Sequence, residues 1–169
     1  MTEVRAAVQA DARDVARLQV RSWQSAYRGL IAQEYLDGLT TEVFADRYTF
    51  GRVGLRMPST LIAVDGIAIR GLVTTGLCRE MDFPNFGELT AIYVDPAHVR
   101  TGVGRLLITA ARQRLRLVGV TGALLWVLDG NVPARRFYER DGWRLDGACR
   151  TVTFGNSAVK QVRYRCAPV

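Results

Sequence analysis

Hydrophobic and polar positions recur with two different periods along the chain, and these periods predict strands and helices. Residues 3–10 read as a short strand, and residues 11–29 as an amphipathic helix that stops at Gly29. A second helical region, residues 32–50, is interrupted by Gly38. The first third of the chain is therefore predicted to contain one strand followed by two helical segments.

The rest of the chain alternates strand-like and helix-like segments. The dipeptide Asp65-Gly66 predicts a hairpin between the first two strands of this part. One helix should follow Gly104, since its apolar residues recur at helical spacing, and Pro133 near the start of another segment favours a short helix. The predicted strands cover residues 59–66, 68–78, 87–94, 122–131, 149–155 and 159–166.

The resulting order of elements is β-α-α-β-β-β-α-β-α-β-β, which predicts an α/β fold with a mixed sheet. Hairpins require antiparallel neighbours, whereas a strand-helix-strand unit requires a parallel pair. At 169 residues and 49% hydrophobic composition, the chain fits a single domain, residues 1–169.

Composition changes this picture only slightly. No apolar run approaches the roughly 20 residues that span a bilayer, and the N-terminal pattern is not that of a signal peptide, so we predict no membrane partner. The cysteines Cys78, Cys149 and Cys166 are scattered and form no C-x-x-C pair. We therefore predict no disulfide framework and no metal site, and we expect a cytoplasmic protein.

The formal charge of +7 raises the question of a nucleic-acid partner. Only one of the 23 basic residues is a lysine, Lys160, and the arginines are spread along the whole chain. No basic cluster on a recognisable nucleic-acid-binding scaffold is present, so nucleic acid is not a predicted partner. The arginines between residues 100 and 116 still require either an anion nearby or a solvated helix face.

Gly102-Val103-Gly104 lies between a predicted strand and a predicted helix. A Walker loop is excluded because no lysine follows, and a dinucleotide fingerprint fails because Leu107 occupies the third glycine position. Two residues without Cβ, followed by a helix N-terminus, favour close approach of an anion to backbone N–H groups. The alternative is a tight turn with a solvated arginine face.

Two sequence blocks favour the anion-binding loop over the tight turn, because together they resemble a known protein family. The first, residues 87–107, has a strand, Asp95-Pro96 and the two glycines; the second, residues 131–144, has Asn131, Ala134, Phe137, Tyr138, Gly142 and Trp143 in register. Together they resemble the GNAT superfamily of acetyl-CoA-dependent N-acetyltransferases. Val99 departs from the family pattern, which has Gln or Arg there.

The resemblance implies a GNAT-like fold, with a mixed, mostly antiparallel central sheet flanked by helices, and acetyl-CoA as cosubstrate. It implies that the strand residues Ile92, Tyr93 and Val94 contact the pantetheine arm, that Asn131 faces that arm, and that Tyr138 lies near the thioester sulfur. The pyrophosphate would lie on the loop formed by Val99, Arg100, Thr101, Gly102, Val103, Gly104 and Arg105.

Acetyl transfer to an amine requires a proton acceptor, because an alkylamine with a pKa near ~10 is mostly protonated at neutral pH. Glu88 is the candidate base, acting through water, with a structural ion pair as the alternative. Tyr138 is the candidate acid for the leaving thiolate. In the family the first two helices shape the acceptor pocket, so Trp23 and Tyr27 are the candidate acceptor-binding residues.

We therefore predict an N-acetyltransferase that moves an acetyl group to a primary amine of a small molecule or peptide by direct attack in a ternary complex. The alternative is a catalytically degenerate member that binds acetyl-CoA as a sensing or interaction module. The acceptor itself is not named by the sequence, and both a monomer and a homodimer are compatible with it.

Overall fold

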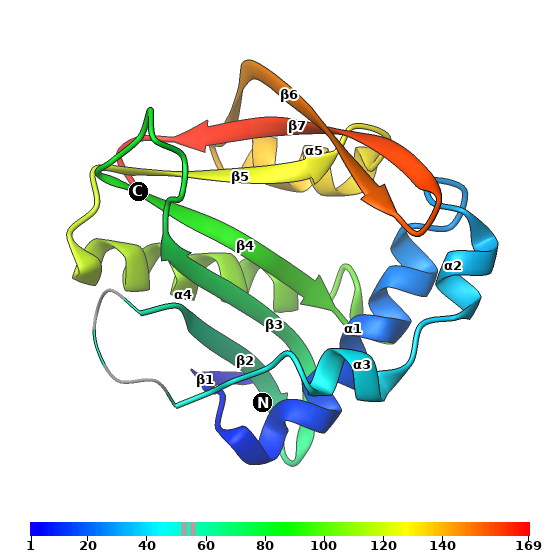
Figure 1. The fold of residues 1–169 in the computed structure, drawn as a ribbon. Helices are drawn as coiled ribbons and strands as arrows, with labels where there is room; N and C mark the ends of the chain where they lie inside the picture. Colours follow the sequence, from blue (N-terminus) through cyan, green and yellow to red (C-terminus); the bar gives the residue numbers. More distant parts are fainter. Residues whose placement is uncertain (52–53, 55–56) are drawn as a thin grey trace.

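A computed structural model of the chain describes residues 1–51, 54 and 57–169. A seven-stranded sheet with strand order β1-β2-β3-β4-β5-β7-β6 forms its centre (Figure 1). Every neighbouring pair is antiparallel except β4 and β5, which run parallel, so the predicted mixed, mostly antiparallel sheet is confirmed. The strands are β1 (Glu3–Ala6), β2 (Ser59–Asp65), β3 (Ala68–Leu77), β4 (Phe86–Val94), β5 (Gly122–Leu128), β6 (Arg144–Phe154) and β7 (Ser157–Cys166).

Helices cover both faces of this sheet. The largest core cluster joins α4 and α5 to one face, through Leu107 and Tyr138 among others, whereas α1 packs on the opposite face through Val15 and Leu18. Apolar residues at helical spacing produce both contacts, since each helix buries one stripe. The helices are α1 (Ala12–Ala26), α2 (Gln33–Asp37), α3 (Thr41–Ala45), α4 (Val103–Val118) and α5 (Val132–Arg140), with short 3₁₀ turns at Gln9–Asp11 and Pro96–His98.

The predicted order of elements is confirmed, with differences at the boundaries. The second helical region consists of α2 and α3, and Gly38 ends α2 as predicted. Asp65 pairs with Ala68, which confirms the hairpin. β6 begins at Arg144, five residues before the predicted strand, because its early residues pair with β7 across an irregularity in register. None of the described helices is long and apolar enough to cross a membrane.

Strand β4 determines the shape of the site. Its pairing with β5 covers only Phe86, Gly87 and Glu88, whereas its pairing with β3 continues to Val94. A bulge in β4 interrupts its pairing with β3. The consecutive residues Thr74 and Thr75 of β3 pair with Ala91 and Leu89, so Thr90 is the extra residue of β4. Beyond Glu88 the two central strands diverge.

Candidate active site

The divergence of β4 and β5 opens a cleft of about 960 Å³. Its walls come from the free half of β4, the C-terminal half of β5, the end of α1, the loop before α4 and one face of α5. Because β4 is paired only with β3 beyond Glu88, alternate backbone N–H and C=O groups between Leu89 and Val94 face the cleft without a strand partner. An extended, amide-containing molecule could pair with this strand as an additional strand would.

The loop at one end of the cleft is held in a conformation that glycine favours. Gly102 has φ 93° and stands immediately before α4, and Arg100 has φ 64°, the one non-glycine residue with positive φ in the described chain. No atom lies within 4 Å of the position that a Cβ on Gly102 would occupy. The unpaired N–H groups at the start of α4 are therefore accessible to an anion from the cleft.

Asp95 positions this loop from the side of α1. Its carboxylate accepts a hydrogen bond from the Ala97 N–H at 3.0 Å and forms an ion pair with Arg21 of α1. Burial alone would raise the pKa of Asp95, but the Ala97 N–H and Arg21 outweigh it, and the pKa lies below its ordinary value. The Asp95-Pro96 dipeptide thus has a structural role that the sequence did not show.

Most of the residues predicted for the cofactor line the cleft. Those that line the cleft are Ile92, Tyr93, Val94, Val99, Arg100, Gly102, Gly104, Arg105, Asn131 and Tyr138, and Tyr27, predicted for the acceptor, lines it as well. Thr101 and Val103 do not line it. The Thr101 hydroxyl donates to the His98 carbonyl, and Val103, the first residue of α4, is buried in the core, so both act on the shape of the loop.

Four exposed arginines line the cleft, and none of them forms an ion pair within the described residues. Arg100 and Arg105 belong to the loop, as predicted, whereas Arg136 and Arg140 lie one turn apart on α5 and were missed. Their i, i+4 spacing in a short helix was the available signal. The other α4 arginines have partners: Arg112 donates to Asp141 at 2.8 Å, Arg114 to the Gly54 carbonyl at 3.4 Å and Arg116 to the Val169 backbone oxygen at 2.7 Å.

Replacement of Gly102 by Ala should weaken coenzyme A binding by about 10-fold, because a side chain at φ 93° forces the loop to rearrange. Gly119→Ala is the matched control. Gly119 ends the same helix with φ 84°, and the space around it is equally open. Both variants should lose a similar amount of thermal stability. Titration calorimetry with coenzyme A should then show a loss for Gly102→Ala alone, and unchanged affinity in both would contradict the role of the loop.

Tyr138 and its neighbours occupy the middle of the cleft. Burial raises the pKa of the Tyr138 phenol, and the nearby Tyr93 raises it further. The pKa values of Tyr27 and Tyr93 are also raised, mainly by burial, and Tyr27 is raised further by Tyr93 and Tyr138. The phenols of Tyr27 just after α1, Tyr93 of β4 and Tyr138 of α5 therefore act on one another and remain protonated at neutral pH.

Asn131 and Phe137 have structural roles beside their places in the cleft. The Asn131 side chain caps α5 by accepting a hydrogen bond from the Ala134 N–H at 3.3 Å. The Phe137 ring lies 3.3 Å from where a Cβ on Gly104 would be, so this glycine allows α4 and α5 to approach closely. Phe137 and Tyr138 both line the cleft, and Tyr138 is the more buried of the two.

Glu88 is the last residue of β4 that pairs with β5, immediately before the part of β4 that lines the cleft. Its side chain points away from α4, because its neighbours Gly87 and Leu89 both face that helix. The carboxylate is buried and forms an ion pair with the exposed Arg79 at 3.5 Å. Glu88 is thus on the face opposite α4, and it does not line the cleft itself.

Trp23 does not line the cleft either. Its ring packs between Tyr27, Phe44 and Phe154, with centroids 5.2 to 5.5 Å apart, and it also contacts Tyr93. It therefore supports Tyr27, whereas Ser22, Ser25, Ala26 and Tyr27 are the residues on the α1 side that line the cleft.

The comparisons with known proteins agree with this geometry. A family model described as the acetyltransferase (GNAT) family matches residues 19–143. The chain belongs to this family, and it is an acyltransferase of the GNAT type. It is 29% identical over 140 residues to a Bacillus subtilis protein named uncharacterized N-acetyltransferase YuaI, over 82% of this chain and 78% of that protein.

Two further similarities come from Thermoplasma acidophilum. The spermidine N(1)-acetyltransferase of this organism is 22% identical over 89% of this chain and 88% of its own length. The crystal structure of its PaiA N-acetyltransferase in complex with coenzyme A superimposes with a TM-score of 0.72 at 18% identity, over 95% of this chain and 98% of the other. The second comparison shows a shared fold.

Proposed function

We propose that this protein transfers the acetyl group of acetyl-CoA to a primary amine of a small molecule or peptide, by direct attack within a ternary complex. The observation that supports this most strongly is the cleft between β4 and β5. It has a free strand edge along one wall and a helix N-terminus at its end, which together suit an amide-containing arm and a pyrophosphate.

The residues present fit acetyl-CoA along the whole cleft. Backbone groups of Ile92, Tyr93 and Val94 bind the pantetheine arm, and Asn131 faces it from β5's end. The loop from Val99 to Arg105 binds the pyrophosphate, with Arg100 and Arg105 supplying positive charge. Backbone N–H groups of β4 polarise the thioester oxygen, which favours attack at its carbonyl carbon.

In this proposal one side chain accepts a proton and another donates one. Glu88 accepts the proton of the attacking amine through a water molecule, from the face opposite α4. Tyr138 donates a hydrogen bond and then a proton to the departing sulfur, whose thiol has an ordinary pKa near ~8.5. Tyr27 borders the acceptor side, and Trp23 holds it in place.

Release of free thiol from acetyl-CoA, measured with a panel of amines, amino acids and peptides, tests this function. Spermidine belongs in the panel because one relative is named for it. Turnover that depends on an amine, with the N-acetyl product identified by mass spectrometry, supports the proposal. Tight coenzyme A binding without turnover of any amine would instead indicate a binding module.

The phosphate contacts can be tested separately. Arg105→Ala and Arg140→Ala should each weaken the binding of coenzyme A by roughly 5- to 10-fold. Both should leave the binding of pantetheine nearly unchanged, because coenzyme A carries phosphates and pantetheine does not. Arg112→Ala is the control, since Arg112 is held by Asp141 and should affect stability alone. Equal losses for both ligands would show that the two cleft arginines are surface charges.

A further inference from the structure

The face of the sheet opposite α4 carries a polar strip beside Glu88. Along β5, Leu125 and Val127 pack in the core beneath α4 and α5, so Trp126 faces the opposite side. Cross-strand partners share a face, which places Arg163, the partner of Trp126, in the strip as well. By the same register Gln161 and Arg150, which are paired with each other, belong to it.

Arg79, Arg150, Arg163 and Arg165 lie close to Glu88, Trp126 or Asp146 in this strip, and three of these four arginines are paired with carboxylates. Arg79 pairs with Glu88 at 3.5 Å, and Arg163 and Arg165 both pair with Asp146, at 2.7 and 3.2 Å. Arg163 also lies 3.8 Å from Glu80. In the described part of the chain, Arg150 alone among the four has no ion pair.

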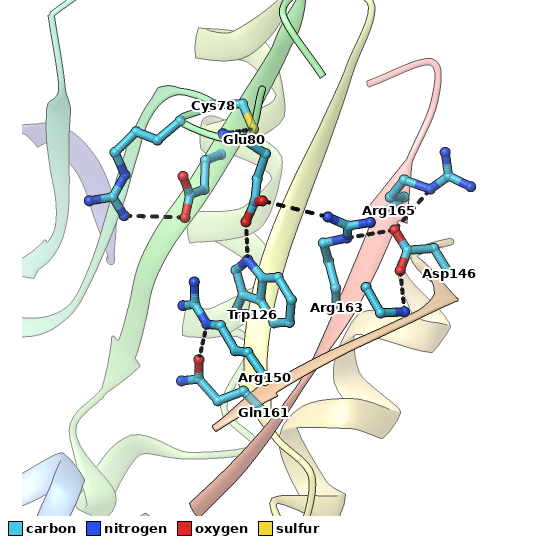
Figure 2. A network of polar contacts seen from close by, with 11 residues as sticks. Cys78, Glu80, Trp126, Asp146, Arg150, Gln161, Arg163 and Arg165 are labelled. Atoms are coloured by element: carbon cyan, nitrogen blue, oxygen red, sulfur yellow. Dashed lines mark hydrogen bonds and ion pairs between the residues drawn. The ribbon is translucent and has the colours of Figure 1, made fainter. Parts of the chain in front are cut away.

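Arg150 is nevertheless held in a defined position. Its guanidinium lies over the Trp126 ring, 4.2 Å from the ring centroid, and its Nε donates to the Gln161 side-chain oxygen at 2.8 Å (Figure 2). The Trp126 indole is itself fixed, because its Nε1 donates to Glu80 at 3.0 Å. These contacts use only one edge and one face of the guanidinium, so both terminal amino groups remain without partners among the described residues.

This arrangement lies at the edge of the cleft. Trp126 and Gln161, the two residues that hold Arg150, both line the cleft, on the side away from the α4 loop. Burial lowers the pKa of Arg150 below its ordinary value, while Glu88 and Glu80 act in the opposite direction. The carboxylate of Glu88 and the guanidinium of Arg150 are thus within electrostatic range of one another across the strip.

We propose that Arg150 is an anion-binding residue of the acceptor site, and that the acceptor is an amine whose own molecule carries a carboxylate or a phosphate. The proposal rests on the function proposed above, because it places the amine near Glu88. A planar guanidinium with two free amino groups binds carboxylate and phosphate oxygens in pairs. A polyamine is disfavoured, since its second cation would face Arg150.

Matched acceptors test this choice. Thiol release should be measured with glycine and glycinamide, with β-alanine and its amide, and with O-phosphoethanolamine and ethanolamine. Spermidine, which carries several positive charges, is the cationic acceptor of the panel. For the wild type we expect kcat/KM for at least one anionic acceptor to exceed that for its neutral partner by about 10-fold. The carboxylate and phosphate pairs then show which anion is preferred.

Arg150→Gln isolates the contribution of the guanidinium. It should raise KM for the preferred anionic acceptor roughly 10-fold and change the neutral partner little, and Arg150→Lys should recover part of the loss. For each acceptor, the kcat/KM of the wild type is divided by that of the variant, because this ratio cancels differences in amine reactivity between the acceptors. Arg144→Gln, an exposed arginine on the same strand, is the control and should leave both unchanged.

Two results would overturn the proposal: higher kcat/KM for spermidine or a neutral amine than for every anionic acceptor, or equal effects of Arg150→Gln on both members of each pair. If no amine is acetylated, the function proposed above fails. The role of Arg150 can then still be tested by measuring the binding of small anionic ligands. Calorimetric titration with N-acetylglycine and with N-acetylglycinamide should then show a preference for the acid that Arg150→Gln abolishes. No such preference would refute the anion site.

Discussion

Tyr138→Phe is expected to lower kcat by roughly 10²-fold and to leave acetyl-CoA affinity within a few-fold of the wild type. The substitution removes only the phenolic oxygen. The ring would keep its packing against Phe137, Trp143 and Tyr164, whose centroids lie 5.5 to 6.4 Å away. Because the Tyr138 hydroxyl makes no hydrogen bond to the described residues, its removal leaves no protein partner unpaired.

The raised pKa of Tyr138 keeps the phenol protonated throughout the neutral range, as a proton donor requires. The effect of Tyr138→Phe should depend on the leaving group. An acyl thioester with a more acidic thiol needs less help, so its turnover should fall less than that of acetyl-CoA. Tyr164→Phe is a suitable control, since the Tyr164 hydroxyl binds Glu139 and Arg135 away from the cleft. Unchanged turnover of both donors in Tyr138→Phe would reduce Tyr138 to a packing residue.

Glu88→Gln is expected to lower kcat/KM about 10²-fold near pH 7, with the loss shrinking as the pH rises above 9. The sign follows from the acceptor: below its ordinary pKa near ~10 an alkylamine is protonated and needs a base, whereas above it the free amine is already present. The pH profile of kcat/KM for wild type and variant, measured with one acceptor at saturating acetyl-CoA, gives this difference directly.

Glu88 also has a structural partner, so the pH profile must separate the two roles. A loss of the Arg79 ion pair would lower activity by the same factor at every pH, and Arg79→Gln should reproduce it. Glu80→Gln is a second comparison, because Glu80 lies on the same face but is held by Trp126 and Arg163. A uniform loss in Glu88→Gln would assign the residue to structure rather than to proton transfer.

Local patterns were sufficient for most of the elements. The periods of apolar residues predicted β4 and α4, and Gly38 and Asp65-Gly66 predicted an interruption and a hairpin that the structure contains. These signals depend on residues a few positions apart, so they can be read directly from the sequence. The same holds for Asn131 and Tyr138, which are seven residues apart on one short helix.

Contacts between distant segments were not predictable in this way. The approach of Tyr27, Tyr93 and Tyr138 joins three elements that are far apart in the sequence. Likewise, the sequence suggested that Arg112 faces either a bound anion or solvent, whereas in the structure it forms an ion pair with Asp141 of another segment. Which arginines face the cleft is decided by packing, because every arginine has the same chemistry in the sequence.

The sequence by itself determined the order of elements, the loop at Gly102 and the family, because these depend on local spacing and on two short blocks. The tertiary structure alone decided where β4 leaves β5, and therefore where the cleft opens. It also separated Glu88 from the cleft wall and placed Arg150 over Trp126 without an ion pair to any described residue. The physical reason is that the strand registers around the cleft and the side-chain partners beside it are set between residues 10 to 46 positions apart, and no local sequence pattern specifies such pairs.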